Sequence, residues 1–183
     1  MAIWLIRAGS HGEYEQKFIS ENRVYVTWDK LDVNLAKLAD RDDLIQEMMK
    51  LYPKDKPKTL INWSSQVWPF AHDIKLGDIL VIPLKSQPVI QIGEVTGEYK
   101  FEMCGPNPFF HWRSVKWIGE AIPRANFGQD ILNSLGAFMT ICRIKRNDAE
   151  DRINKMWANK WKPETLSAAI SNSNEKGLVL KIS

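Results

Sequence analysis

The segment Ile74–Leu84, IKLGDILVIPL, places a Gly77-Asp78 turn directly before an apolar run. A short run of Ile, Leu and Val bounded by a turn is typical of a β-strand, so we predict a strand over Ile79–Leu84. A second apolar run, Ile3–Arg7, closes on Ala8-Gly9-Ser10. These small residues predict a glycine-bearing turn after the first strand.

The rest of the chain alternates strand and helix signals. Further strands are predicted at Arg23–Trp28, Val89–Gly97, Trp112–Ala121 and Ala137–Ile144. Helical spacing of apolar residues predicts helices over Glu13–Asn22, Asp40–Tyr52, Thr59–Ile74, Phe127–Leu132 and Asn147–Trp161. Asp40 is the expected N-cap of the second helix, and Pro69 is expected to kink or split the third. The pattern is that of an α+β protein with strands spaced as in a meander.

Composition limits the class of protein. With 183 residues, of which 44% are hydrophobic and 26% charged, the chain is long enough for one substantial core. No apolar run approaches the roughly 18–20 residues that span a bilayer, so we expect no membrane partner and a cytoplasmic location. Cys104 and Cys142 lack metal-ligand spacing. The sequence therefore predicts no metal site, no disulfide framework and no cofactor.

Charge and aromatic content allow contact with nucleic acid. A net charge of +3 and a pI near 8.8 permit binding to phosphates without requiring it. The eight tryptophans supply large flat apolar faces, more than core packing alone usually needs. The segment Asn62–Phe70, NWSSQVWPF, mixes such faces with amides and hydroxyls. That mixture suits base recognition by Trp63, Ser64, Gln66 and Trp68, and it equally suits a helix that buries its apolar side in the core.

Two further segments carry candidate ligand contacts. Arg7 leaves the first strand beside small residues and is placed to meet a phosphate or a base edge, or else water. Glu13 is placed to accept from an exocyclic amine, or else only to favour the helix dipole. The loop Tyr99–Arg113, which contains Phe109 and Phe110, is expected to form an aromatic wall or to fold back as a lid. Phosphate contacts are assigned to Arg113, Lys116 and Lys85.

One pattern points to catalysis. Asp78 with Glu98 and Lys100 loosely matches the acids and lysine of metal-dependent nucleases, although a Lys-x-Gly-Asp turn needs no metal. The sequence contains no nucleophile elbow, Walker loop or dinucleotide fingerprint, and its three histidines are scattered. We therefore predict a binding module with no catalytic residues of its own, and keep a small metal-dependent nuclease as the alternative.

Several motifs together resemble a known family. The motifs are IWLIRAG, VYVTW, NWSSQVWPF, IKLGDILVIPL, IGEV and SLGAFMTI, at Ile3–Gly9, Val24–Trp28, Asn62–Phe70, Ile74–Leu84, Ile92–Val95 and Ser134–Ile141. In this order they resemble the N-terminal domain that precedes Mrr-like nuclease domains in modification-dependent (type IV) restriction systems. The first strands, the Lys-x-Gly-Asp turn and the Val115–Ile118 and Ile122–Phe127 segments are more distantly similar to EVE and YTH domains of the PUA-like superfamily.

The resemblance implies a fold and two segments. It implies an α+β, PUA-like (EVE/YTH-like) small mixed β-barrel flanked by helices, with a C-terminal helical tail. Residues 1–146 are then the base-recognition domain, and residues 147–183 a helix followed by a linker or tail.

It also implies a function. Such domains take a flipped, often methylated, base into an aromatic cage. By position, Arg7, Ala8, Gly9 and Glu13 would contact the base edge, and the stacking walls would come from Trp28 or Tyr25 and from Phe109 and Phe110. Arg-Ala-Gly stands where YTH domains carry a Lys-Ser-Asn trio, so the preferred base is open. The restriction context suggests modified cytosine in double-stranded DNA, with the nuclease in a fused or partner domain; an RNA-binding or protein-interaction domain of the same fold is the remaining alternative.

Overall fold

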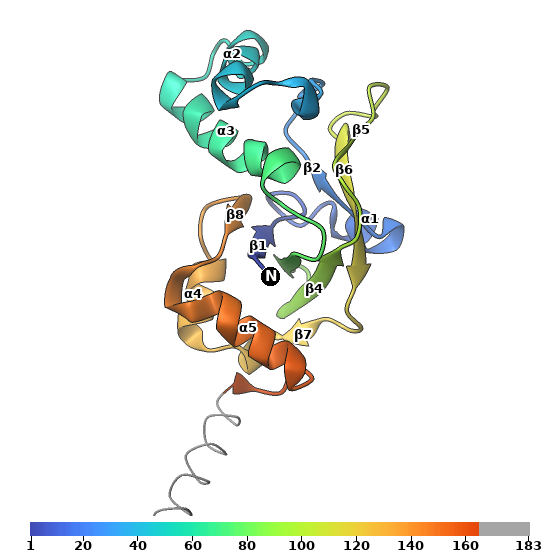
Figure 1. Cartoon of the computed structure of the whole chain (residues 1–183), viewed down its shortest axis with the longest axis vertical. Coiled ribbons are helices and arrows are strands. Elements are labelled where there is room, and N and C mark those ends of the chain that lie inside the picture. The colour runs from blue at the N-terminus through green and yellow to red at the C-terminus, as the bar shows by residue number, and fades with distance from the viewer. Residues whose placement is uncertain (165–183) are drawn as a thin grey trace, which may run out of the picture.

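A curled, mixed β-sheet forms the centre of the computed structural model, which describes residues 1–164 (Figure 1). Its strands follow the order β2-β6-β4-β3-β1-β8, with β5 paired to β6 and β7 paired to β4. The pair β1–β3 is parallel, and the other pairs are antiparallel. The strands are β1 (Ile3–Ile6), β2 (Arg23–Val26), β3 (Ile79–Pro83), β4 (Val89–Val95), β5 (Lys100–Phe101), β6 (His111–Trp117), β7 (Ile122–Pro123) and β8 (Ile141–Arg143).

The sheet is open. In the described residues β2 and β8 lie at its two ends and do not pair with each other, so the curl amounts to a half-barrel. The expected mixed α+β class and the mixed sheet are confirmed, whereas the expected small barrel is only half closed. Five α-helices accompany the sheet within residues 1–164: α1 (Glu15–Glu21), α2 (Arg41–Leu51), α3 (Pro57–His72), α4 (Gln129–Leu135) and α5 (Ala149–Ala158).

The central strands are buried on both faces. In β1, Ile3 and Leu5 join one apolar cluster while Trp4 and Ile6 join the other, because successive side chains of a strand point to opposite faces. The parallel register Ile3↔Ile79 gives β3 the same alternation. The near-continuous apolar runs of these two strands follow from this double burial.

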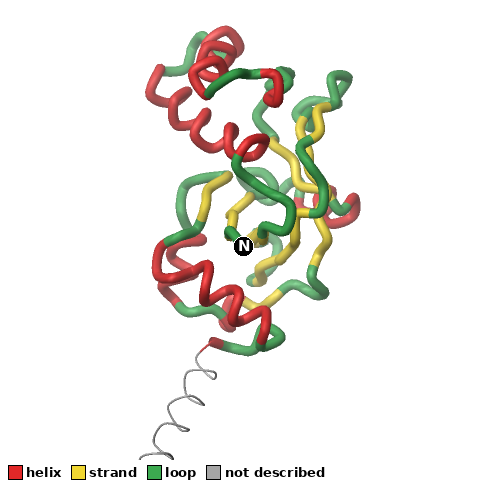
Figure 2. The backbone as a smooth tube through the Cα atoms, viewed as in Figure 1, coloured by secondary structure: helices red, strands yellow, loops and turns green. Residues whose placement is uncertain are grey.

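Helices cover the two faces separately. α2 and α3 pack on the cluster that contains Trp4, through Leu44, Met48, Val67 and Phe70 among others. The opposite cluster contains buried residues of α4 and α5, which are Ile131, Leu135, Ala149, Ile153 and Met156. Figure 2 shows these two groups of helices at opposite ends of the body, with the strands between them.

Most predicted helices and strands lie close to observed ones. The short strands β5 and β7 were not predicted, and three predicted features differ. Asp40 caps α2 as expected, with its side chain accepting from the Asp43 N–H at 2.9 Å. Pro69 does not split α3, which continues to His72; it lies near the C-terminal end, where its carbonyl accepts from the backbone of Asp73. The strand predicted from Ala137 begins only at Ile141, and the strand predicted to Ala121 ends at Trp117.

The C-terminal helix belongs to the same body as the sheet. Ile153 and Met156 of α5 are buried against strand residues, and the Arg152 guanidinium reaches the Asp130 carboxylate on α4 at 2.6 Å. The predicted C-terminal helix is therefore present as α5, and it packs on the sheet. The remainder of the predicted tail, residues 165–183, lies outside the described residues.

Asp78 ties the turn before β3 to the N-terminal strand. Its carboxylate accepts from Trp4 Nε1 at 3.0 Å, from the Lys75 N–H at 3.0 Å and from the Ala2 N–H at 3.3 Å. The side chain is 9% exposed, so removing it leaves buried donors without an acceptor.

We expect Asp78→Ala to lower the free energy of unfolding by about 2–3 kcal/mol, measured by urea denaturation. Asp73→Ala, which alters the residue just after α3, is the control and is expected to change stability by less than about 0.5 kcal/mol. Equal midpoints for the two variants would contradict the bracing role of Asp78.

Candidate functional site

Four of the predicted base-binding residues line one cavity. Gly9 and Glu13 come from the turn between β1 and α1, Trp28 follows β2, and Trp63 comes from α3. The cavity has a volume of about 320 Å³, which is in the lower part of the range for small-molecule sites. We call it the Trp28–Trp63 cavity; its remaining lining residues are Ser10, Tyr14, Thr27, Asp29 and Thr140.

Two indole rings form the aromatic walls of this cavity. The ring centroids of Trp28 and Trp63 are 6.5 Å apart, and their planes meet at 71°. Tyr52, which follows α2, packs edge-on against the Trp63 indole, with ring centroids 5.3 Å apart. Because the two indoles are not parallel, a planar ligand that stacks on one of them meets the edge of the other.

A carboxylate, that of Glu13, also lines the cavity. Gly9 has φ +89°, and a Cβ built on it would lie 2.4 Å from the Cδ atom of Glu13. The Glu13 carboxylate thus occupies space that only glycine leaves open. Hydrogen bonds from backbone N–H groups, first that of Glu13 itself and then that of His11, lower the pKa of this carboxyl below its usual value. Ionised at neutral pH, it is an acceptor only.

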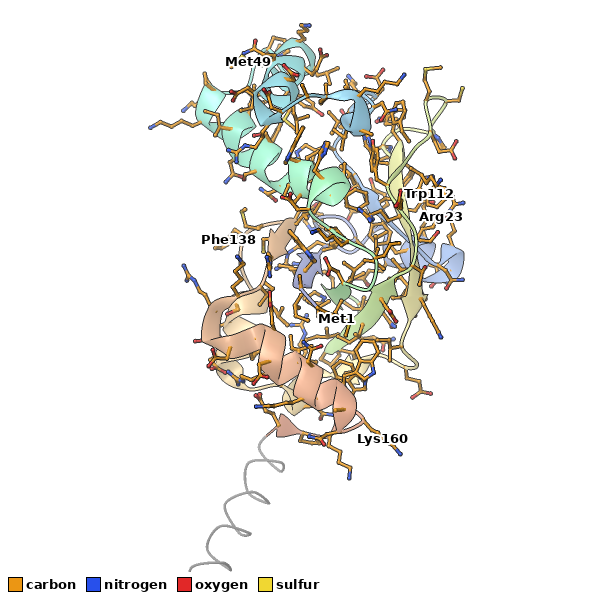
Figure 3. The ribbon with its side chains drawn as sticks, in the orientation of Figure 1. Met1, Arg23, Met49, Trp112, Phe138 and Lys160 are labelled. Atoms are coloured by element: carbon orange, nitrogen blue, oxygen red, sulfur yellow. The ribbon has the colours of Figure 1, made fainter. Side chains whose placement is uncertain are left out.

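Tyr25 and Phe109 lie in a neighbouring cavity of about 430 Å³. Their ring centroids are 5.2 Å apart, and Phe109 also meets Tyr14, which lines the Trp28–Trp63 cavity, at 5.0 Å. In this second cavity the Arg23 guanidinium lies over Trp112, 3.6 Å from the ring centroid. Figure 3 labels the two residues next to each other. The residues predicted to form the aromatic walls therefore lie in two cavities. The contact between Tyr14 of the first cavity and Phe109 of the second connects them.

Gln66 and Ser64 are buried and do not line the cavity. The Gln66 Oε1 atom accepts from the Thr140 N–H at 2.7 Å, and its Nε2 donates to Asn62 at 2.8 Å. The Ser64 hydroxyl donates to the carbonyl of Ile61 within α3. Both side chains hydrogen-bond inside the protein, and the contribution of Gln66 to the site is to hold Thr140, which lines the cavity.

Three other predicted contacts are buried as well. Ala8 and Phe110 are 3% and 8% exposed, and Arg113 is 3% exposed. The Arg113 guanidinium donates to the carbonyls of Phe70 at 3.0 Å and Gly97 at 3.2 Å. The expectation that Arg113 contacts a phosphate is corrected, because its donors join the end of α3 to the strand β6 instead.

The remaining predicted residues lie on other surfaces. Arg7 donates three hydrogen bonds to backbone carbonyls of the segment 135–139. Trp68, also on α3, stacks on His72 with centroids 3.7 Å apart. Lys85 and Lys116 are exposed, and Lys85 shares a cavity of about 600 Å³ with Arg7.

The two acids of the pattern proposed for a nuclease make other contacts. Asp78 accepts hydrogen bonds in the turn before β3, and Glu98 lines a cavity together with Arg113. Across residues 1–164, no three His, Cys, Asp or Glu side chains are grouped so as to hold a metal ion. Cys104 and Cys142 are both free thiols. In that same part of the chain, none of the helices has the length and apolarity required to cross a membrane.

Comparison with protein families gives a match over most of the chain. The model of a family described as a domain of unknown function (DUF8426) matches residues 4–144. The chain belongs to the DUF8426 family. Every residue that lines the Trp28–Trp63 cavity, from Gly9 to Thr140, falls within the DUF8426 match, whereas α5 follows it. Among curated proteins, none matches the chain.

Proposed function

We propose that this chain is a DNA-binding recognition module that accepts an extruded base, a modified cytosine, in the Trp28–Trp63 cavity. The observation that carries the proposal is the meeting of two indole faces with an ionised carboxylate in one base-sized cavity. An aromatic face stacks any base, and base–aromatic stacking contributes about 1–3 kcal/mol. Extrusion from the duplex is the general means by which proteins bring a single base into such a cavity.

Glu13 supplies selectivity in this proposal. Cytosine presents an exocyclic amine, and a carboxylate that is an acceptor only pairs with that donor. Thymine presents a carbonyl oxygen at the equivalent position, which a carboxylate repels. The chemistry of the cavity therefore favours amine-bearing bases, and the resemblance to type IV restriction proteins favours modified cytosine among them.

The wider context of the proposal also comes from resemblance. The half-barrel with helices on both faces is compatible with a PUA-like fold, and the sequence motifs resemble the recognition domains that precede Mrr-like nucleases. In this proposal the chain is a targeting module in the cytoplasm, and DNA cleavage belongs to a fused or partner nuclease domain. The chain itself contributes binding and no catalytic residue.

A binding titration tests the proposed function. The protein is titrated with matched DNA duplexes that carry cytosine, 5-methylcytosine, 5-hydroxymethylcytosine or N6-methyladenine, and with an RNA duplex of the same sequence, at one salt concentration. A preference of more than about tenfold, or about 1.4 kcal/mol, for one modified-cytosine duplex is expected. Equal, salt-sensitive binding to all five, or tighter binding to the RNA, would contradict it.

Gly9→Ala is expected to reduce affinity for the preferred duplex about tenfold, because the added Cβ displaces the Glu13 carboxylate from the cavity. Gly77→Ala is the matched control. Gly77 has nearly the same backbone angle, φ +87°, but a Cβ there meets nothing within 4 Å. Both variants carry the same backbone strain, so an equal loss of affinity in both would show that the Glu13 contact is not involved.

A further inference from the structure

Phe138 is the most exposed large apolar side chain in the described part of the protein, with a relative exposure of 105%. It stands at the outer edge of the molecule beside β8 (Figure 3). A single exposed apolar residue is ordinary on a protein surface. The features that set Phe138 apart are the way its loop is held and the surfaces that border the loop.

The Arg7 side chain hydrogen-bonds to the backbone of the loop that carries Phe138. Its guanidinium donates to the carbonyls of Leu135 at 2.8 Å, Ala137 at 2.9 Å and Met139 at 3.1 Å, on both sides of Phe138. The next residue, Thr140, is fixed by Gln66 and also accepts from the Arg7 N–H at 2.9 Å. The backbone on either side of the phenyl ring is therefore anchored, so its outward position is determined by the fold.

The loop 136–140 borders the aromatic cavity. Thr140 lines the Trp28–Trp63 cavity, and Phe138 is two residues away, which places their Cα atoms at most about 7 Å apart. The loop that carries Phe138 therefore lies next to the cavity in which the proposed extruded base would be held.

Two further cavities that residues of this loop or its neighbours line contain cationic side chains. Ala137 lines a cavity of about 610 Å³ together with Arg143, Lys145 and Arg146, and with one acidic residue, Asp130. Leu135 and Gly136 line the cavity that holds Lys85 and Arg124. These five cations are exposed, although Arg143 is paired with Glu150 at 2.8 Å. A polyanionic backbone that crosses this face would find positive charge in both of these cavities.

We infer that Phe138 is a wedge that enters the base stack of a nucleic-acid duplex beside the base held in the Trp28–Trp63 cavity. The inference rests on the proposed function. Extruding a base leaves a gap in the stack, and an inserted apolar side chain restores part of the lost stacking. Arg7 is the positioning residue, because it fixes the loop from which the wedge projects.

The test compares Phe138→Ala with the native protein on three probes. The first is a 5-methylcytosine duplex with guanine opposite the modified base. The second is the same duplex with an abasic site in place of that guanine, and the third is the modified strand alone. Because a wedge acts against pairing and stacking, we expect about a tenfold loss on the first probe and less than about threefold on the other two. Met49→Ala, which alters a 38%-exposed side chain on α2 far from the loop, is the control and should change none of them (Figure 3).

A second variant examines the positioning role. Arg7→Gln removes the charge and most of the donors beneath the loop, and it is expected to shift the ratio of paired-duplex to single-strand affinity in the same direction as Phe138→Ala. A general loss of folding would lower both affinities together and leave that ratio unchanged.

Two results would overturn the inference. In the first, Phe138→Ala binds the paired duplex as tightly as the native protein does; in the second, it loses the same factor on all three probes. Either result would contradict the wedge and leave the proposal for the Trp28–Trp63 cavity intact. Failure of the proposed function has a different signature, in which Trp63→Ala leaves affinity for every probe unchanged.

Discussion

Trp63→Ala is expected to weaken binding to the preferred duplex about 10- to 100-fold. The indole of Trp63 forms one wall of the Trp28–Trp63 cavity, and stacking of a base on such a face contributes about 1–3 kcal/mol. Trp28→Ala is expected to act in the same direction. Equilibrium titration measures the loss, with circular dichroism and thermal unfolding to confirm that each variant is folded.

Trp68→Ala is the matched control for this substitution. Trp68 lies on the same helix, is half-buried like Trp63, and stacks on His72 outside the cavity. We expect its affinity to stay within about threefold of the native value, since it touches no part of the Trp28–Trp63 cavity. If Trp68→Ala and Trp63→Ala lost the same factor, tryptophan packing in α3 would explain both and the cavity would have no special role.

Arg113→Leu has the second large expected effect, and it acts on stability. Burial lowers the pKa of the Arg113 guanidinium, yet its donors still satisfy the carbonyls of Phe70 and Gly97. Leucine leaves both carbonyls without that donor, and we expect the free energy of unfolding to fall by about 3 kcal/mol. The midpoint of urea denaturation measures this change at constant slope.

Lys116→Leu provides the comparison on the same strand. Lys116 is exposed on β6, where it faces Glu94 of β4 in the sheet register. Its replacement should change stability by less than about 0.5 kcal/mol. If Lys116 contacts a phosphate, the variant also reduces the slope of log affinity against log salt concentration by about one, which corresponds to one fewer counterion released. An Arg113→Leu protein as stable as Lys116→Leu would contradict the structural role of Arg113.

Local sequence signals predicted most of the elements. The cap at Asp40 and the apolar runs of β1 and β3 each depend on residues close together in the chain, so they were visible without the fold. Ends were less predictable: the run Ala137–Ile144 looked like one strand, but Arg7 captures the carbonyls of its first half and holds it as a loop. Such a contact between residues about 130 positions apart leaves no local trace.

Only part of the site could be predicted. Gly9, Glu13 and Trp63 were singled out by residue type and Trp28 by the family resemblance, and all four line one cavity, whereas Thr140 was missed. Thr140 reaches the cavity because its N–H is fixed by Gln66, a contact that no local pattern indicates. Conversely, three predicted contact residues have polar groups suited to a ligand but use them in hydrogen bonds within the protein. They are Gln66, Ser64 and Arg113. Residue type alone does not distinguish these two uses.

The packing of the C-terminal helix α5 on the sheet could not be predicted from the sequence either. A charged helix with few apolar residues predicts a peripheral element, and α5 has only three buried residues, Ala149, Ile153 and Met156. They suffice because the sheet face they meet is fully apolar and α4 lies alongside. The half-closed barrel is likewise a property of strand pairing across long separations, which periodicity does not reveal.

Photo-crosslinking tests the central claim most directly. A duplex that carries 5-iodocytosine at the target position is bound to the protein, irradiated, and digested for mapping by mass spectrometry. The proposed extrusion predicts a crosslink at Trp28, Trp63 or Tyr14, the aromatic residues that line the cavity. A crosslink confined to other surfaces, such as the Arg23–Trp112 face, would contradict the claim that the base enters the Trp28–Trp63 cavity.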